Sequence, residues 1–355
     1  MRICLISIIM ISGTIISYEA TVLVTGGAGF IGSHVVEHLA ARGDRVIIID
    51  PCMAGDDELS MCYTVAKQHH LKKIMARFPD AISWYRYDIQ DKKKLEELFY
   101  KEQPTHICHL AACAGVRKSI EDPEQYIKAN IIGTLHVLDM AKKYRVEHVV
   151  IASSSSVYGD CQEGPFFESQ KTDWQSSPYG MTKKAGELLA YTYYHLYDVP
   201  CTCLRFFTVY GPWGRMDMAP FIFLDAVCQK NIVTITGDGS AVRDFTYIDD
   251  IVCGIVKALD YSCGFEIINL GRGQPINIID FLRVIEQVTG IEAQVNYTAA
   301  FAADVSLTHA DITKAYMLFN YAPKVSVYEG MRRMYEWYCD DYSSLIENMT
   351  LEYFS

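Results

Sequence analysis

Short apolar stretches alternate with longer segments of helical period from residue 21 to about residue 210. The apolar stretches read TVLVTG, RVIIID, ISWYRYD, HICHLAA, HVVIASS and CTCLRFF. Such nearly continuous apolar runs are typical of strands that are buried on both faces. The alternation therefore predicts an α/β fold in which helices cover both faces of a parallel sheet.

The pattern loosens after GPWGR, and VRDFTYIDDIVCGIVKALDY then adds one more strand and helix. The remaining sequence mixes short strands and helices, which indicates a smaller α/β substrate-binding lobe. We expect the larger domain to comprise residues 20–212 and 240–262, and the smaller lobe residues 213–239 and 263–345. No linker rich in Pro or Ser separates them, so the two should pack closely with a cleft between them.

The first 19 residues form an apolar extension that begins MRICLISIIMISGTIIS. This stretch resembles a signal peptide or anchor, but it is short for a membrane span, which takes about 20 apolar residues. We favour a non-spanning extension and a cytoplasmic protein. A membrane anchor or a secretory route through residues 1–19 remains the alternative, and only then would the sequons at Asn296 and Asn348 matter.

Composition narrows the possible partners. Net charge is −11 with scattered basic residues, so no surface is set up to bind nucleic acid. The 12 cysteines are spread along a long chain, and several lie within apolar runs, which favours reduced thiols over disulfides. Neither a C-x-x-C pair nor a Cys/His spacing suggests a metal site, so we expect none.

A glycine-rich loop follows the first predicted strand, in VLVTGGAGFIGSHVVEHLAARGDRVIIID. Gly26 permits a tight turn, Gly29 lets backbone N–H groups approach a pyrophosphate, and Gly32 allows close packing of helix on sheet. The loop lies between a strand and an amphipathic helix that Gly43 should end. The context predicts a Rossmann-type doubly wound sheet that binds a dinucleotide. The loop residues expected to hold the cofactor are Gly26, Gly29, Phe30, Ile31 and Gly32.

The ends of the neighbouring strands offer further cofactor contacts. Asp50 ends the second strand, 18 residues after Gly32, where a carboxylate accepts hydrogen bonds from ribose hydroxyls and favours NAD over NADP. The alternative is that Asp50 only caps its strand. Asp88 and Ile89 should face the adenine and Ala111 the pyrophosphate, unless these residues serve turns or packing.

The stretch SSPYGMTKK predicts a helix capped by Ser177, with Pro178 in its first turn. Tyr179 and Lys183 stand four apart and share one face of this helix. An ammonium group close to a phenol stabilises the phenolate and lowers its pKa, so Tyr179 could act as a base. An exposed Tyr/Lys pair is the alternative, but IASSSS at the end of the fifth strand places a site nearby.

Several motifs together resemble a known family. TGGAGFIG, ASSSSVYG, SPYGMTKK, RFFTVYGPWGR and VRDFTYIDD are similar to those of the NAD-dependent nucleotide-sugar epimerases and dehydratases, which are extended short-chain dehydrogenases/reductases. Within that family, the segments AGVRKSIEDPEQYIKANIIGTLHVLD and RFFTVYGPWGRMDMAPF look most like UDP-glucuronate 4-epimerases. The resemblance implies an isomerase with a UDP-sugar substrate and bound NAD.

The resemblance also implies roles for the catalytic residues. Ser154 would be the hydroxyl partner of Tyr179, and Lys183 would bind the nicotinamide ribose. Tyr179 would remove the proton of the sugar 4-OH while the C4 hydride passes to NAD. The resulting 4-keto sugar would turn in the site and take the hydride back on its other face, which gives the C4 epimer.

Ser155 and Ser156 then distinguish the reactions within the family. Relatives that dehydrate the keto sugar carry Asp and Glu at these two positions, and relatives that decarboxylate it carry Glu at the second. Without an added acid or base the intermediate should be reduced again, so we expect epimerisation. Serine hydroxyls also suit a sugar carboxylate, although an ordinary Ser-rich turn is the alternative.

The same resemblance suggests handles for the substrate. Arg243 and Arg215 would hold the diphosphate and uridine side, Thr208 the sugar-nucleotide edge and Asp304 the uridine ribose. Arg117 would reach a phosphate or the carboxylate, or remain a surface charge. Two stretches depart from the family pattern, PCMAGDDELSMCYTVAK after Asp50 and AAFAADV, where Phe301 takes the place of a polar residue.

The resemblance suggests a homodimer through helices near residues 126–144 and 179–197. Two other functions stay open at this stage. One is C4 epimerisation of a neutral UDP-hexose, either UDP-glucose or UDP-N-acetylglucosamine. The other is a non-catalytic NAD-binding protein, which would need the glycine loop but neither Tyr179 nor Lys183.

Overall fold

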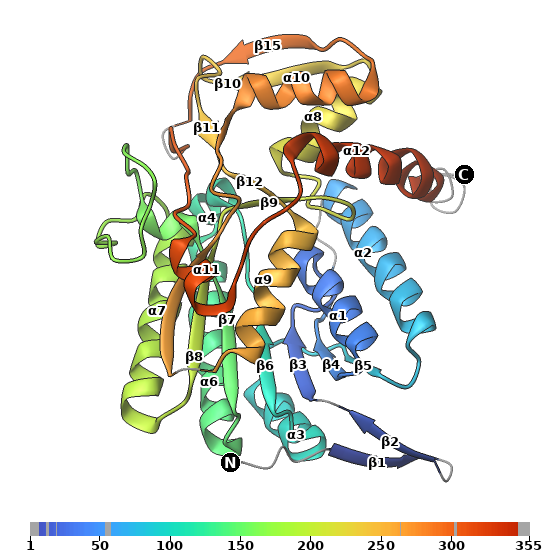
Figure 1. Ribbon diagram of the computed structural model, residues 1–355, viewed down its shortest axis with the longest axis vertical. Helices are drawn as coiled ribbons and strands as arrows, with labels where there is room; N and C mark the ends of the chain where they lie inside the picture. Colours follow the sequence, from blue (N-terminus) through green and yellow to red (C-terminus); the bar gives the residue numbers. More distant parts are fainter. Residues whose placement is uncertain are drawn as a thin grey trace.

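The computed structural model describes residues 7–11, 14–18, 20–53, 58–262, 264–301 and 304–346. For residues 7–18 and 58–60 it describes the backbone alone. Figure 1 shows a sheet flanked by helices, with a smaller group of strands and helices above the upper ends of its strands.

The centre of the molecule is a seven-stranded, fully parallel sheet with the order β13-β8-β7-β6-β3-β4-β5. Its strands are β3 (Thr21–Thr25), β4 (Arg45–Ile49), β5 (Ile82–Tyr85), β6 (His106–His109), β7 (His148–Ser154), β8 (Cys201–Phe206) and β13 (Phe265–Leu270). The strand order reverses between β3 and β6, and the crevice at such a switch point is where α/β sheets bind ligands. The sheet confirms the predicted fold class.

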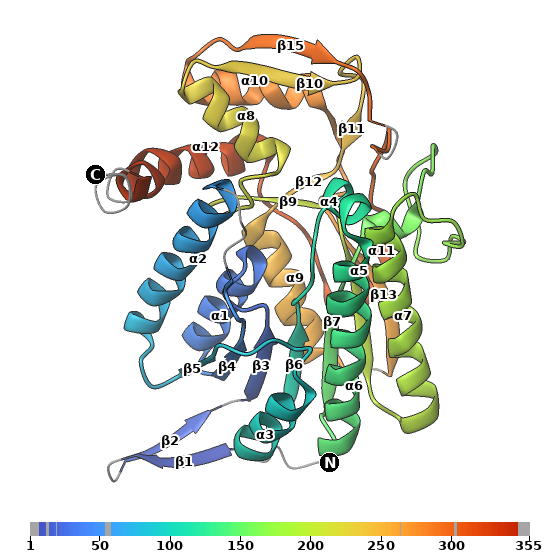
Figure 2. The same ribbon diagram turned by 180° about the vertical axis from the view of Figure 1, so that it is seen from behind.

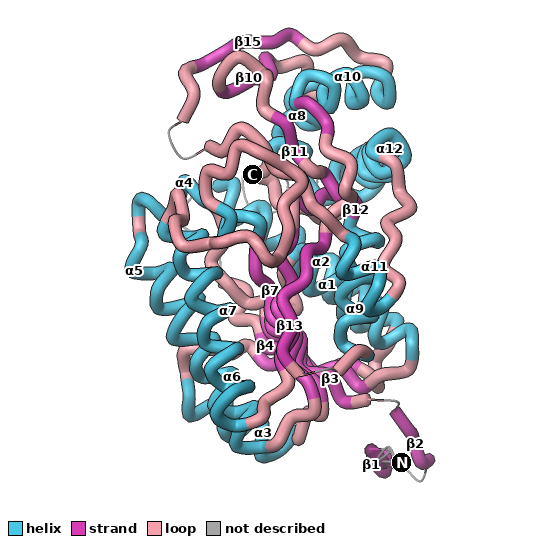
Figure 3. Tube along the Cα trace, turned by 60° about the vertical axis from the view of Figure 1, so that its left-hand side comes forward, coloured by secondary structure: helices cyan, strands magenta, loops and turns pink. Residues whose placement is uncertain are grey.

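Helices cover both faces of the sheet, as the edge-on view in Figure 3 shows. One face carries α1 (Phe30–Arg42), α2 (Glu58–Arg77) and α9 (Ile248–Asp260). The other carries α3 (Lys92–Glu102), α6 (Gly133–Tyr144) and α7 (Pro178–Tyr197). Alternate residues of each strand supply the two cores: Val22 and Val24 of β3 pack with the first group, and Leu23 between them packs with the second.

The smaller lobe lies above the carboxyl ends of the strands (Figure 2). It contains α8 (Ala219–Cys228), α10 (Ile278–Thr289), α12 (Val327–Trp337) and the parallel pair β10 (Ile232–Thr236) and β15 (Gln294–Thr298). Short pairs link it to the larger domain: β9 (Thr208–Tyr210) with β12 (Phe245–Tyr247), and β11 (Val242–Arg243) with β14 (Ile276–Asn277).

One predicted domain boundary is wrong. Residues 263–345 were expected to belong wholly to the smaller lobe, yet β13 pairs with β8 from Phe265 to Leu270 and forms the edge of the main sheet. The strand next to it, β8, would otherwise expose one row of backbone N–H and C=O groups, and β13 satisfies them. The chain therefore stays in the larger domain until Leu270, and not only until residue 262 as the sequence pattern indicated.

The N-terminal extension is described in part. β1 (Ser7–Ile11) and β2 (Thr14–Tyr18) pair antiparallel as a hairpin, while residues 1–6, 12, 13 and 19 lie outside the described residues. The sequon at Asn348 also lies outside them, whereas Asn296 lies on β15, whose side chains are exposed. Across the described ranges, each helix is too short or too polar to cross a membrane.

A buried ion pair joins the sheet to α7. Arg205 on β8 donates to both carboxylate oxygens of Glu187 on α7, at 2.7 and 2.9 Å, and each side chain is only 1% exposed. Glu187 also accepts from Ser153 Oγ at the end of β7, at 2.7 Å. Burial raises the pKa of Glu187, but the hydrogen bonds from Arg205 outweigh it, so the pKa lies below its ordinary value. This network fixes α7 against two strands.

We expect Glu187→Gln to lower the free energy of unfolding by about 3 kcal/mol or more, because it leaves the buried Arg205 charge without its counter-ion. The matched control is Glu96→Gln in the exposed pair with Lys143, which should cost less than about 1 kcal/mol. The apolar double variant Arg205→Met with Glu187→Leu should recover much of the loss. Urea unfolding measures all three, and equal losses in the two single variants would contradict this assignment.

Candidate active site

The glycine loop leaves no room for side chains. A Cβ at Gly32 would lie 2.1 Å from the carbonyl oxygen of Gly26, so α1 can pack this close only at glycine. Gly26 has φ +70°, and a Cβ there would lie 2.8 Å from the backbone nitrogen of Ala111 after β6. The loop thus brings bare backbone to the switch point between β3 and β6, which fits the close approach of a dinucleotide pyrophosphate.

Asp50 ties the end of β4 to this loop. Its carboxylate accepts from the backbone N–H of Ala28 at 3.1 Å and of Cys52 at 2.7 Å. Burial raises the pKa of Asp50, while these backbone hydrogen bonds and the charge of Lys67 lower it in part. Asp50 therefore does cap its strand, and the remaining lone pairs of its oxygens leave it able to accept from ribose hydroxyls as well.

The other predicted cofactor residues lie around the same crevice. Phe30 begins α1 and is buried, and Ile31 packs against the adjoining core. Asp88 follows β5 and accepts from the backbone of Gln90. The side chain of Ile89 is buried, and a Cβ at Gly133 would lie 2.5 Å from it. The side chain of Ile89 thus belongs to the core on the α6 side of the sheet.

Tyr179 and Lys183 lie in the first turns of α7, over the carboxyl end of β7. Ser177 Oγ accepts from the backbone of Gly180 at 3.1 Å, and Pro178 is the first residue, as predicted. Lys183 Nζ donates to the carbonyl of Ala152 at 2.8 Å and lies 5.9 Å from the centre of the Tyr179 ring. Ser154 ends β7 and hydrogen bonds with Tyr179, so the three predicted catalytic residues come together.

The electrostatics of Tyr179 differ from the expectation. Burial raises the pKa of the phenol above its ordinary value, and hydrogen bonding with Ser154 and the charge of Arg215 lower it in part. The prediction that Lys183 lowers the pKa of Tyr179 below its ordinary value is therefore wrong. The Lys183 amine turns to the Ala152 carbonyl, and burial lowers the pKa of Lys183 to about 8.

The charge of Arg215 lowers the pKa of the catalytic tyrosine, Tyr179. It forms an ion pair with Asp217 at 2.7 Å, and its Nη2 lies 3.4 Å from the carbonyl of Ala114. A Cβ at Gly115 would lie 3.3 Å from the same nitrogen. The structure thus places Arg215 near Tyr179 and the loop that contains Gly115.

The serines after Ser154 form one turn of helix, η2 (Ser155–Tyr158). Ser154 Oγ accepts from the backbone N–H of Ser156 at 3.1 Å and lies 3.2 Å from Ser156 Oγ. Ser155 and Ser156 are partly exposed. A Ser-rich turn is therefore present, and its hydroxyls adjoin the catalytic serine.

The remaining substrate candidates lie where the two lobes meet. Thr208 begins β9 and pairs with Phe245. Arg243 donates to the carbonyls of Val242, Val305 and Ser306, and burial lowers its pKa while Asp304 raises it. A half-buried cation suits an anionic ligand. Arg117 and Asp304 bind each other instead, at 2.6 Å, with Arg117 over the ring of Phe301.

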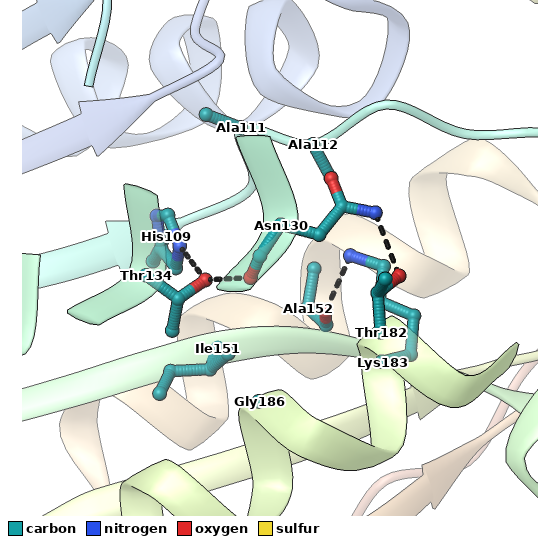
Figure 4. A pocket seen from close by; sticks show the side chains of 10 residues that line it. All are labelled: His109, Ala111, Ala112, Asn130, Thr134, Ile151, Ala152, Thr182, Lys183 and Gly186. Carbon is teal, nitrogen blue, oxygen red and sulfur yellow. Dashed lines mark hydrogen bonds between the residues drawn. The ribbon is translucent and has the colours of Figure 1, made fainter. Parts of the chain in front are cut away.

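A chain of polar residues beneath the site was not anticipated (Figure 4). Asn130 lies in a π-helical turn, η1 (Ile127–Ile132), where it binds the backbone of Cys113 and donates to Thr182 at 2.9 Å. Thr134 bridges His109 and the carbonyl of Asn130. These three residues and Lys183 line a cavity of about 10 Å³. A polar residue within an apolar helical run, as in IKANII, is the signal that could have identified Asn130.

A glycine loop at the switch point of a parallel sheet, with a Tyr/Lys/Ser cluster over the end of β7, defines a short-chain dehydrogenase/reductase type of enzyme. The family model described as GDP-mannose 4,6 dehydratase matches residues 23–334. The chain belongs to this family of nucleotide-sugar dehydratases and epimerases.

Curated and solved relatives extend over nearly the whole chain. A UDP-glucuronate 4-epimerase from Thermodesulfobacterium geofontis is 42% identical, covering 89% of this chain and 95% of its own. The structure of a Bacillus cereus UDP-glucuronic acid 4-epimerase with UDP-glucuronic acid and NAD is 33% identical, with a TM-score of 0.82, over 89% of this chain and 98% of that one. A Thermotoga maritima UDP-glucose 4-epimerase with UDP-glucose is 31% identical, with a TM-score of 0.79, over 90% and 98%.

We expect Lys183→Met to stabilise the fold at pH 7. A lysine whose pKa falls from 10.5 to about 8 destabilises the folded state below pH 8, and the penalty disappears as pH rises from about 8 to 10.5. The variant should gain on the order of 2–3 kcal/mol at pH 7, with the gain approaching zero by pH 10.5.

Chemical unfolding of both chains, freed of nucleotide and measured across this pH range, tests the expectation. Lys184→Met is the control because Lys184 is partly exposed and adjoins the same helix turn. A gain that does not vary with pH would show that the buried charge of Lys183 is not its source.

Proposed function

We propose that this chain is a UDP-glucuronate 4-epimerase that interconverts UDP-glucuronate and UDP-galacturonate with tightly bound NAD. One observation carries the proposal: Ser154, Tyr179 and Arg215 meet at the end of β7, and serines follow Ser154 where an acid/base pair would direct another reaction. The support from similarity is strong, because the relatives named UDP-glucuronate 4-epimerase cover nine-tenths of the chain.

Tyr179 is the catalytic base and acid in this reaction. It accepts the proton of the sugar 4-OH and later returns it, so the group ends each cycle as it began. Ser154 holds the phenolic oxygen by a hydrogen bond that favours the phenolate. NAD held at the glycine loop would supply the hydride acceptor and donor for C4.

The fate of the 4-keto sugar depends on what else touches it. Dehydration would need a proton donor and acceptor, and Ser155 and Ser156 have neither role at neutral pH, because an alcohol is a weak acid and a weak base. The ketone therefore persists until it has turned and is reduced again. Epimerisation is the outcome for this chain, even though its family model is named for a dehydratase.

Arg215 gives the site its preference for a uronate. Its guanidinium lies beside Tyr179, and the ion pair with Asp217 leaves donors directed at Ala114. Asp217 occupies only part of the guanidinium, so a carboxylate on the sugar would accept a charge-assisted hydrogen bond from Arg215, whereas a neutral hydroxymethyl group would accept a weaker one. For Arg243 and Thr208 we retain the roles predicted from the family, which are contacts with the diphosphate and with the sugar-nucleotide edge. Asp304, predicted to bind the uridine ribose, forms an ion pair with Arg117 instead.

We also infer a homodimer through α6 and α7. The outward face of α7 carries exposed Leu188, Tyr191, Leu196 and Tyr197, each at least 44% exposed. An apolar surface on two long neighbouring helices suits self-association about a twofold axis. A cytoplasmic location is supported by the ten described cysteines, all of which are free thiols.

Incubation with three UDP-sugars tests the function directly. UDP-glucuronate should give UDP-galacturonate, with kcat/KM at least about 100-fold above UDP-glucose and UDP-N-acetylglucosamine, since a charged site rejects a neutral analogue. Tyr179→Phe should lose about 10²–10⁴ in kcat and keep NAD. Product analysis by chromatography distinguishes galacturonate from a pentose or a deoxy sugar.

Each contrary product points to a different error. Conversion of only a neutral sugar would identify a UDP-hexose epimerase, the activity in the name of the Thermotoga maritima neighbour, and overturn the role of Arg215. A pentose or deoxy sugar would overturn the roles of Ser155 and Ser156. Full activity in Tyr179→Phe would overturn the assignment of the base.

Charged residues on the outward face of α7 should break the dimer. We expect Leu188→Lys combined with Leu196→Lys to be monomeric by light scattering, because the change places like charges against each other across a twofold axis. Met317→Lys is the control, since Met317 is 76% exposed on α11 (Thr313–Phe319) and lies away from α7. A monomeric wild-type chain would refute the assembly.

A further inference from the structure

Arg117 is one of the side chains that join the larger domain to the smaller lobe. Arg117 lies on the short helix α4 (Val116–Glu121), and its Nη2 donates to Asp304 at 2.6 Å and to Thr236 Oγ1 at 3.4 Å. Its guanidinium also lies 5.1 Å from the centre of the Phe301 ring. All three partners belong to the smaller lobe, so Arg117 bridges the two halves. Figure 2 shows α4 directly below this lobe.

The same short helix holds the catalytic residue. Ser119 is fully buried, and its Oγ accepts from the backbone N–H of Tyr179 at 3.1 Å while donating to the carbonyl of Val116. Gly115, just before the helix, lies against Arg215. α4 therefore contacts the smaller lobe through Arg117 and the catalytic tyrosine through Ser119, two residues apart.

We propose that Arg117 is a positioning residue that locks the smaller lobe over the cleft while the 4-keto sugar turns, so that the ketone is reduced before it can leave. The inference rests on the proposed epimerase function. It assigns to Arg117 a contact between lobes in place of the direct contact with a phosphate or carboxylate that the sequence suggested.

The chemistry of epimerisation makes such a lock necessary. Oxidation at C4 removes from the sugar a hydride, which carries two electrons, and the proton of the 4-OH, and it leaves a ketone together with one reduced cofactor. The ketone must then break its sugar contacts and rotate to present its other face. If the cleft opens at that moment, the ketone escapes, the proton passes to solvent, and the enzyme keeps a reduced cofactor that cannot oxidise the next substrate.

The ion pair between Arg117 and Asp304 is weak enough to break and form again in each catalytic cycle. The side chains of Arg117 and Asp304 are 53% and 31% exposed, so solvent weakens the ion pair and it can break in each cycle. The Phe301 ring adds a face for the guanidinium to stack on, which a lysine would use less well. Phe301 departs from the family pattern, and the lock gives that departure a purpose.

Release of the ketone is the quantity to measure. Wild-type chain and Arg117→Met are mixed with UDP-glucuronate, released carbonyl is trapped with a hydrazine reagent, and reduced cofactor is followed by its near-ultraviolet absorbance. We expect Arg117→Met to release the ketone about threefold to tenfold more often per turnover, with activity decaying as reduced cofactor accumulates. Asp304→Asn should do the same.

Two further arms separate a lock from a direct substrate contact. Exchange of the charges, Arg117→Asp with Asp304→Arg, should return ketone release toward the wild-type level. Raising the salt concentration should increase release by the wild-type chain but not by Arg117→Met, because salt screens an exposed pair. Arg283→Met is the control, since it removes an exposed arginine, paired with Asp280, from the same lobe.

The outcomes are distinct. If Arg117→Met only raises KM and releases no ketone, or if the exchanged pair does not restore retention, the proposal is overturned. If the wild-type chain converts no UDP-sugar, the proposed function itself has failed. An active wild type with variants that retain the ketone refutes the lock and leaves the epimerase intact.

Discussion

The active site depends on the buried ion pair between Arg205 and Glu187. It ties β8 to α7, and through Ser153 it reaches the end of β7, so the two elements that carry Tyr179 and Ser154 share one anchor. A charge pair at this depth stabilises the fold only when both partners are hydrogen bonded. The main contribution of this pair is to hold α7 and β7 in a fixed arrangement, and not to add net stability. The Tyr179 phenol and the Ser154 hydroxyl therefore cannot move independently.

On the cofactor side of the cleft the chain lacks side chains at two glycines of its loop, and on the substrate side it carries positively charged ones. At the switch point, Gly26 and Gly32 remove side chains so that bare backbone can meet a pyrophosphate. Across the cleft, Arg215 and Arg243 supply positive charge, although the protein as a whole is acidic. The concentration of cations in one cleft of a chain with net charge −11 marks where an anionic ligand belongs.

An epimerase of this kind must let its intermediate turn without letting it go. The serines after Ser154 provide hydroxyls but no strong acid or base, which leaves the ketone chemically undisturbed. The ketone must also be kept in the cleft, which is a separate requirement. The helix α4 can meet it because it contacts both Tyr179 and the smaller lobe. Reaction outcome in this chain is thus set as much by what holds the lobes together as by the catalytic residues.

The sequence by itself determined the parallel sheet, the glycine loop and the Tyr/Lys helix, because each rests on local spacing: apolar runs, glycines at a turn, and an i, i+4 pair behind a Ser-Pro cap. It could not place β13, whose partner β8 lies about 60 residues earlier in the chain. Nor could it show that burial raises the pKa of Tyr179, or that Arg117 meets Asp304. Solvent exclusion and contacts between distant segments exist only in the folded chain, so the tertiary structure alone decided them.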